Sequence, residues 1–273
     1  TILREMSIPV DLKDRVTLEK SAVTPLSSKI VSQHAPRISQ IAVEAVMRIF
    51  ESVQMIDLKQ IRVIPRLGGT IEDMELVNGV VLTQEAMKAA GGPNRMEAAR
   101  IALVQFQLSP PKPDMDNQIV VNDYKQMDRI LREERQYLLE MCKKIKKTNC
   151  NVLLVQKSIL RDAVSELALH FLAKLKIMTI SNIERDDFEY LSKNLDCKPI
   201  ADIESFTEDK LGYADLVEEV ALEGCSYTRI TGIKGKTPVS VVCRGANQAI
   251  LEEVERSLHD ALCVVRCLVK ERA

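Results

Sequence analysis

The sequence lacks tryptophan altogether, and aromatic residues make up only 4% of its 273 residues. Exposed aromatic platforms for stacking nucleic-acid bases are therefore not expected, and the core must be built from aliphatic side chains. The net charge of -1 lacks the positive excess that binds nucleic acid non-specifically. No run of about 18 apolar residues occurs, so no membrane span is predicted. Neither a nucleic acid nor a membrane is expected as a partner.

Metal-binding and disulfide patterns are missing as well. The seven cysteines include no Cys-x-x-Cys pair, and the three histidines are far apart in the sequence, which leaves no zinc motif. Unpatterned thiols in odd number are typical of a reducing, cytoplasmic compartment. Residues 1–14 have no signal-peptide core, and Ile2, Leu3 and Met6 already show helical spacing. The sequence is therefore interpreted as a fragment of a longer cytoplasmic protein.

What the sequence does contain is strong periodicity, first of a helix and then of strands. Apolar residues recur at three and four positions over residues 38–53, which predicts an amphipathic helix. Short apolar runs at residues 61–64, 79–82 and 101–104 predict strands. The proline-rich residues 109–114 exclude a helix or a central strand.

A long helix is predicted from Asn122 or Asp123, either of which could cap it, to about Lys147. Its length of about 24 residues corresponds to roughly 36 Å at about 1.5 Å per residue. Its apolar stripe, which Glu134 interrupts, consists of Met127, Leu131, Leu138, Met141 and Ile145. Two interpretations stay open, because the helix could project from the body or pack along its whole length.

Residues 151–180 predict a β-α-β unit, with a helix from Ala163 to Lys174 between two short strands. This alternation is typical of a parallel sheet covered by helices. The other predicted elements are a helix from Asp186, a short helix at 209–219, strands at 226–230 and 239–243, and a long helix at 247–270. The predicted fold class is an α/β domain inserted between two mainly helical flanks, which pack on each other.

Two segments are candidates for chemistry on spacing alone. Residues 232–237 (Gly-Ile-Lys-Gly-Lys-Thr) look like a P-loop, but Ile230 stands where the motif needs glycine and Pro238 prevents a following helix. They are therefore interpreted as a turn between strands. Asp260 falls opposite the apolar stripe of the last helix, where it is expected to be exposed and paired with Arg256.

The helix from Ala163 is the third candidate. Its expected core face consists of Val164, Leu167, Ala168, Phe171 and Leu172. Polar side chains recur every four residues on another face, at Asp162, Glu166, His170 and Lys174. This row is either an ordinary solvated face or a recognition surface.

Several segments resemble the group II chaperonins, which are ATP-driven protein-folding rings. The likeness is carried by residues 67–73 (Leu-Gly-Gly-Thr-Ile-Glu-Asp), 75–79, 115–121, 126–135, 151–180 and 258–262 (Leu-His-Asp-Ala-Leu). It extends over essentially the whole chain. The protrusion segment and residues 157–162 further resemble one subunit type of the eukaryotic cytosolic ring.

The resemblance implies a discontinuous architecture. An apical substrate-binding domain would comprise residues 62–236, with a helical protrusion at about 109–147. It would be inserted into an α+β intermediate domain made of residues 9–61 and 237–273. Residues 1–8 would be the tail of an equatorial helix.

The resemblance also implies roles for particular residues. Clients would contact the loop residues Leu160, Arg161 and Asp162 and the helix residues Glu166, His170 and Lys174. The lid protrusion would include Asp116, Asn117, Met127 and Leu131. Asp260 matches the aspartate that positions the attacking water when the subunit closes on nucleotide.

The family's Gly-Asp-Gly-Thr phosphate loop does not occur in this sequence. The resemblance implies that the complete subunit is an ATPase that uses ATP and Mg²⁺. Because the phosphate loop is missing, this fragment alone is expected to be inactive and to bind no cofactor. The resemblance also implies the partners, which are unfolded clients such as actin and tubulin and the other subunits of a double-ring hetero-oligomer in the cytoplasm.

Two other functions stay open. A stand-alone phosphate-handling α/β enzyme would use the turn at residues 235–237 together with Asp260, although the failed P-loop spacing counts against it. An adaptor would use the long helix to form a coiled coil, but Glu134 interrupts the stripe that such a helix needs.

Overall fold

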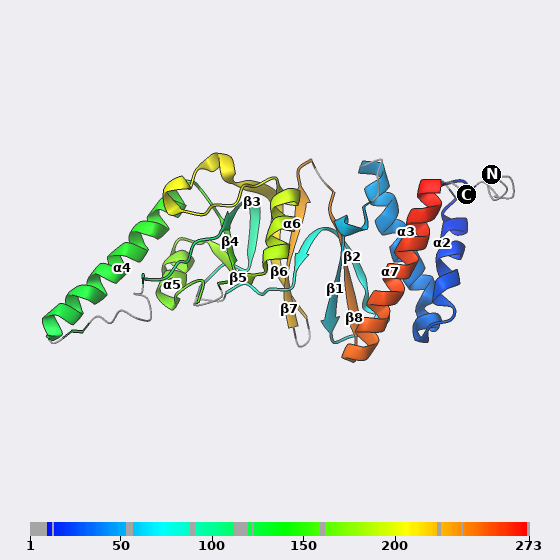
Figure 1. Ribbon diagram of the computed structural model, residues 1–273, viewed down its shortest axis with the longest axis horizontal. Coiled ribbons are helices and arrows are strands. Elements are labelled where there is room, and N and C mark those ends of the chain that lie inside the picture. Colours follow the sequence, from blue (N-terminus) through cyan, green and yellow to red (C-terminus); the bar gives the residue numbers. More distant parts are fainter. Residues whose placement is uncertain are drawn as a thin grey trace. The chain divides into compact units, whose positions relative to one another are not determined.

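The computed structural model describes residues 10–12, 14–52, 57–87, 91–111, 120–121, 123–158, 162–222, 225–235 and 237–271. The chain forms two compact units, and each combines segments that are distant in the sequence. The first unit spans residues 1–81, 221–226 and 235–273, and the second spans residues 82–220 and 227–234. Helices and strands occur in both units (Figure 1), which confirms the predicted mixed α/β class.

Three helices form the larger part of the first unit. They are α2 (Arg15–Val23), α3 (Ala35–Ser52) and α7 (Gln248–Glu271), and all three pack on one another. The Asp14 carboxylate caps α2 by accepting hydrogen bonds from the backbone N–H groups of Val16 and Thr17, at 3.1 and 3.4 Å. The apolar faces that the sequence predicted for α3 and α7 are buried in this core.

The strands of the first unit lie against α7. The central strand β8 (Val239–Gly245) pairs in parallel with β1 (Ile61–Leu67) and antiparallel with β2 (Glu75–Leu82). The Ser240 hydroxyl is fully buried in β8 and donates a hydrogen bond to the Gly79 carbonyl of β2 at 2.8 Å. The first and last parts of the chain therefore share one core.

The second unit is built on a mixed sheet. Its strand β3 (Arg95–Val104) pairs antiparallel with β6 (Gly212–Leu222) and in parallel with β4 (Val152–Gln156). The strand β5 (Met178–Ile183) lies at the edge, parallel to β4, and β7 (Cys225–Ile233) lies beside β6. Its helices are α4 (Tyr124–Lys147), α5 (Glu166–Lys174) and α6 (Arg185–Leu195). The parallel β4-α5-β5 unit confirms the predicted β-α-β pattern.

One predicted element is wrong, the short helix at residues 209–219. Only Glu208–Lys210 forms a 3₁₀ turn, and the strand β6 begins at Gly212. Apolar residues at positions 213, 214, 216, 217 and 220 mimic a helical period. Pairing with β3 overrides this local pattern. Ala214 lies opposite Ala99, and the backbone of β6 is paired with that neighbouring strand along this ladder.

Candidate functional site

The helix α5 presents the row of polar side chains that the sequence predicted. The Ser165 hydroxyl caps the helix by accepting a hydrogen bond from the Ala168 N–H at 3.3 Å. The side chains of Ala168 and Leu172 are buried in the core of the second unit. The polar row is exposed at Glu166, His170 and Lys174 on α5 and at Asp162, which precedes the helix. Two loop residues that the sequence singled out, Leu160 and Arg161, lie outside the described residues.

The core face that the sequence predicted here is confirmed in part. Ala168 and Leu172 on α5, and Val164 just before the helix, are buried as expected. Leu167 was also expected to face the core, but 42% of its surface is exposed, and Phe171 is only partly buried. The buried stripe of α5 is therefore narrower than the predicted one. The exposed face therefore combines charges with an aliphatic side chain.

The long helix α4 divides into two halves of different burial. The Asp123 carboxylate caps it by accepting a hydrogen bond from the Lys125 N–H at 3.2 Å, which selects Asp123 from the two predicted caps. In its C-terminal half, Leu138, Met141, Cys142 and Ile145 are buried in the core. In its N-terminal half no side chain from Tyr124 to Tyr137 is buried.

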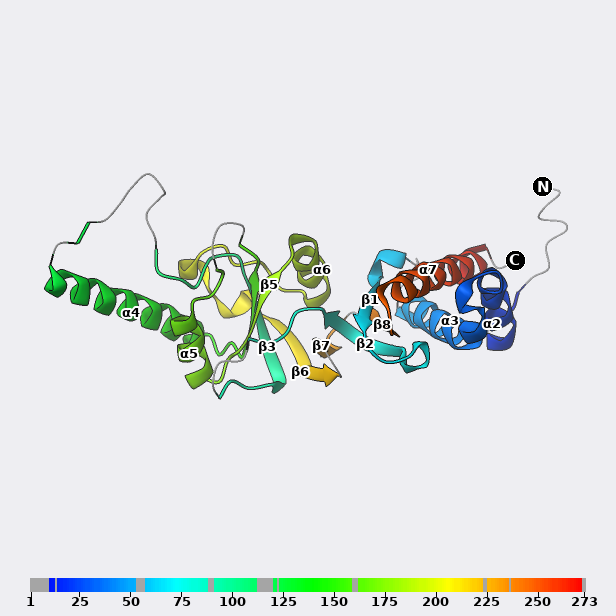
Figure 2. The ribbon, with the colours of Figure 1, turned by 90° about the horizontal axis from the view of Figure 1, so that it is seen from below.

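The N-terminal half of α4 extends beyond the strands of its own unit in both views (Figures 1 and 2). Met127 and Leu131, which the sequence assigned to the protrusion, are 48% and 40% exposed. Of the two open interpretations, projection is thus the one observed for this half. Asp116 and Asn117 lie outside the described residues.

The rates of amide hydrogen exchange are expected to differ between the two halves of α4, with the change near Leu138. Amides of the first half, around Met127 and Leu131, should exchange about tenfold faster or more than those around Met141 and Ile145. An opening free energy lower by about 1.4 kcal/mol is enough for this factor, and no buried side chain holds the first half. Equal protection along the whole helix, measured on the unassembled chain, would show that the first half packs on its own body.

Asp260, the candidate on the last helix, forms an ion pair that the sequence did not predict. The Lys29 ammonium donates a hydrogen bond to its carboxylate. The side chain of Lys29 is 18% exposed and that of Asp260 is 46% exposed. The predicted pairing with Arg256 is wrong, because the Arg256 guanidinium lies 3.8 Å from Glu253 instead. A carboxylate that is half exposed and held by one ammonium can still accept a hydrogen bond from a water molecule.

Lys29 is a functional candidate that the sequence analysis missed. It lies between two 3₁₀ helices, Thr24–Leu26 and Ile30–His34, where its N–H donates to the Leu26 carbonyl at 3.2 Å. It is separated from Asp260 by 231 positions. No periodic pattern in the sequence marks a lysine in such a link, so only the fold reveals this pair.

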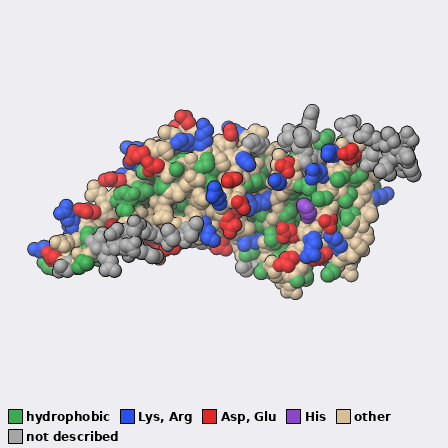
Figure 3. All heavy atoms as spheres, viewed as in Figure 1, with side chains coloured by type: hydrophobic (Ala, Val, Ile, Leu, Met, Phe, Trp, Pro, Cys, Tyr) green, Lys and Arg blue, Asp and Glu red, His purple; other side chains and the backbone are tan. Residues whose placement is uncertain are grey.

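A shallow pocket of about 310 Å³ lies beside the N-terminal half of α7. It is lined by Val63, Glu252, Glu255, Arg256 and His259. Charges of both signs surround it, as they do over the rest of the visible surface, where acidic and basic side chains are interspersed (Figure 3). In the part of the chain that the structure describes, no three His, Cys, Asp or Glu side chains gather closely enough to hold a metal ion. In the same part, no helix is long and apolar enough to cross a membrane.

The buried cysteines are not nucleophiles. Burial raises the pKa of the Cys142 thiol to about 11 and the pKa of the Cys150, Cys197 and Cys243 thiols to about 12. Burial, followed by the nearby Asp260 charge, also raises the pKa of the Cys263 thiol. The four buried thiols are therefore poor nucleophiles at neutral pH.

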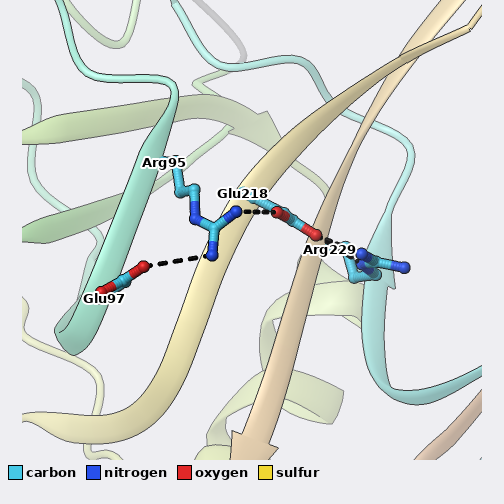
Figure 4. A network of polar contacts seen from close by, with 4 residues as sticks. All are labelled: Arg95, Glu97, Glu218 and Arg229. Atoms are coloured by element: carbon cyan, nitrogen blue, oxygen red, sulfur yellow. Dashed lines mark hydrogen bonds and ion pairs between the residues drawn. The ribbon is translucent and has the colours of Figure 1, made fainter.

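A charged network joins three strands of the second unit (Figure 4). Glu218 of β6, whose side chain is 14% exposed, accepts a hydrogen bond from Arg229 Nε of β7 at 2.9 Å. Arg95 of β3 lies 3.7 Å from the other oxygen of Glu218 and 3.1 Å from Glu97. Both arginines share the Glu218 carboxylate, so the network links β3, β6 and β7.

Comparisons with known proteins agree along the whole chain. A family model described as the TCP-1/cpn60 chaperonin family matches residues 1–273. Proteins named T-complex protein 1 subunit delta are 62% identical in Schizosaccharomyces pombe, 61% in Saccharomyces cerevisiae and 56% in Arabidopsis thaliana. Each match covers 99% of this chain, and 52%, 52% and 51% of the relative. The chain thus spans about half the length of the curated relatives it matches.

A solved structure has the same fold. It is the open-state monomer of a group II chaperonin from Methanococcoides burtonii, with a TM-score of 0.77 and 25% sequence identity. The match covers 98% of this chain and 60% of that one.

Proposed function

The chain belongs to the TCP-1/cpn60 chaperonin family, and from this premise we propose that it is the client-binding and lid-forming part of a chaperonin ring subunit. The family confirms the resemblance found in the sequence. The relatives named delta are of the subunit type that the protrusion and residues 157–162 indicated. We propose further that the complete subunit works in the cytosol within a double ring of different subunits, and that it folds proteins such as actin and tubulin.

The observation that carries the proposal is the exposed face of α5. Glu166, His170 and Lys174 lie on it, and Leu167 adds an exposed aliphatic side chain. Ala168 and Leu172 anchor the opposite face of the helix in the core, and the Ser165 cap stabilises its first turn. A rigid helix with mixed charges and a leucine can bind unfolded chains that present matching charges and an apolar residue.

The domain division that follows is the one the family implies. Residues 62–236 would form the apical domain, with the first half of α4 as part of its protrusion. Residues 9–61 and 237–273 would form the intermediate domain, and residues 1–8 would belong to an equatorial helix. The shared core of α2, α3 and α7 supports a domain built from two distant segments.

The second functional element would be Asp260. Its half-exposed carboxylate could orient and polarise a water molecule for attack on the terminal phosphate of ATP. The turn at residues 232–235 is followed by the strand β8, so it offers no helix N-terminus to a phosphate. We therefore place the binding of ATP and Mg²⁺ on other parts of the subunit.

Charge reversal on α5 tests the client-binding proposal. The double variant Glu166→Lys with Lys174→Glu keeps the net charge but inverts the pattern of the face. Assembled rings that carry it should crosslink to an altered set of clients, because mismatched charge costs more than matched exposed pairs gain, about 0–1 kcal/mol each. The fold should persist, since exposed substitutions change the free energy of unfolding by about 0.5 kcal/mol or less.

The matched control reverses an exposed pair on α6, with Glu189→Lys and Lys193→Glu. It should leave the client set as it is in the unaltered protein. If the α5 variant binds the same clients and keeps its thermal midpoint, this face does not select them.

A further inference from the structure

Two metal-binding side chains meet on the exposed side of α7, on either side of Asp260 in the sequence. His259 and Cys263 lie one helical turn apart, and His259 Nε2 is 3.6 Å from Cys263 Sγ. His259 is exposed and Cys263 is partly exposed. In the first unit, the ion pair of Asp260 with Lys29 does not involve either of them.

The spacing and the distance fit one class of cation. Two side chains four residues apart on a helix are the arrangement that holds zinc in the His-Glu-x-x-His motif. Zinc binds sulfur at about 2.3 Å and imidazole nitrogen at about 2.0–2.1 Å, and a tetrahedral angle between these bonds separates the two atoms by about 3.6 Å. The observed separation is the same. No rearrangement of the helix is then needed for both atoms to bind one ion.

We propose that His259 and Cys263 form a two-ligand site for Zn²⁺ or a similar thiophilic divalent cation, with water completing the coordination. Hard cations such as Mg²⁺ and Ca²⁺ are excluded because they prefer oxygen ligands. Binding releases the proton of the Cys263 thiol to solvent. We infer this site independently of the proposed chaperone function.

Neighbouring charges and the number of protein ligands determine the affinity of the site for the cation. The negative charge of Asp260 acts on Cys263 and favours a bound cation. The positive charge of Arg266 also acts on Cys263 and disfavours one. The next thiol on this side, Cys267, lies eight positions from His259, a rise of about 12 Å along the helix. It is too far from His259 for both to bind the same ion. With two protein ligands, the site binds reversibly and more weakly than the four-ligand sites that hold structural zinc.

Cobalt titration of the 273-residue chain tests the site, because a cobalt–thiolate bond produces a charge-transfer band in the near ultraviolet. The unaltered chain should show this band with one-to-one saturation, and Zn²⁺ should displace the cobalt. Cys263→Ser should abolish the band, and His259→Ala should weaken binding at least about tenfold. Cys267→Ser, which removes a more exposed thiol on the same helix, should change neither.

Three results would overturn the proposal. One is the absence of the band in the unaltered chain, and another is a band that persists at the same strength in Cys263→Ser. The third is equal weakening by Cys267→Ser, which would place the ion elsewhere. Thermal midpoints identify a variant that fails to fold, and in that case the conservative His259→Gln replaces His259→Ala in the same titration.

Discussion

Replacing Asp260 by alanine in the complete subunit is expected to lower the rate of ATP hydrolysis by about a hundredfold or more. Positioned general bases and water-orienting carboxylates contribute about 10²- to 10⁴-fold. The affinity for ATP should change by less than about threefold, because the carboxylate acts on the water and not on the bound nucleotide. Single-turnover hydrolysis and equilibrium ATP binding on assembled rings measure the two quantities separately.

The alanine variant also leaves Lys29 without its partner. The pair is partly exposed, so the loss of stability should stay within about 1 kcal/mol and cannot explain a lost turnover. Arg256→Ala is the matched control, since Arg256 is exposed on the same helix and pairs with Glu253 instead. It should hydrolyse ATP at the normal rate. Lost ATP affinity with normal turnover of bound nucleotide in Asp260→Ala would contradict the assigned role.

The largest effect on stability is expected from Leu258→Ala. Leu258 is fully buried where α7 packs against α2 and α3 in the first unit. Truncating such a leucine removes its transfer free energy and leaves a cavity, which together destabilise by about 2–5 kcal/mol. Denaturant unfolding of the chain, followed by helix signal, should show this loss in the transition of the first unit.

Leu131→Ala is the matched control, because it makes the same truncation on a helix position that is 40% exposed. It should change the free energy of unfolding by about 0.5 kcal/mol or less. A loss below about 1 kcal/mol for Leu258→Ala would mean that α7 does not hold the two distant chain segments together. A large loss for Leu131→Ala would mean that the first half of α4 is packed.

Long periodic helices were predictable from the sequence. The helices α3 and α7 each repeat their apolar stripe over several turns, so helical spacing cannot be mistaken for anything else. The same held for the β4-α5-β5 unit, whose strands are short apolar runs on either side of a helix. The strand β6 was missed because its apolar spacing suits both a helix and a strand. Only the pairing with β3 decides between the two.

The site was predictable to a smaller extent. Spacing placed Glu166, His170 and Lys174 on the surface of α5 and Ala168 and Leu172 in the core, but it could not fix the width of the buried stripe, so Leu167 was misplaced. The Lys29–Asp260 pair joins positions 231 apart and depends on how the whole first unit folds. The contact of His259 with Cys263 is local, and its four-residue spacing could have been read from the sequence.

The most direct test of the central claim is a photo-crosslinker placed at position 170 on the exposed face of α5. The complete subunit, assembled into rings, is incubated with unfolded actin and irradiated, with the same crosslinker at Glu189 on the exposed side of α6 as the matched position. We predict efficient crosslinking to actin from position 170 and little from position 189. Equal yields at the two positions, or no crosslink at position 170, would contradict the proposal that this face of α5 binds unfolded clients.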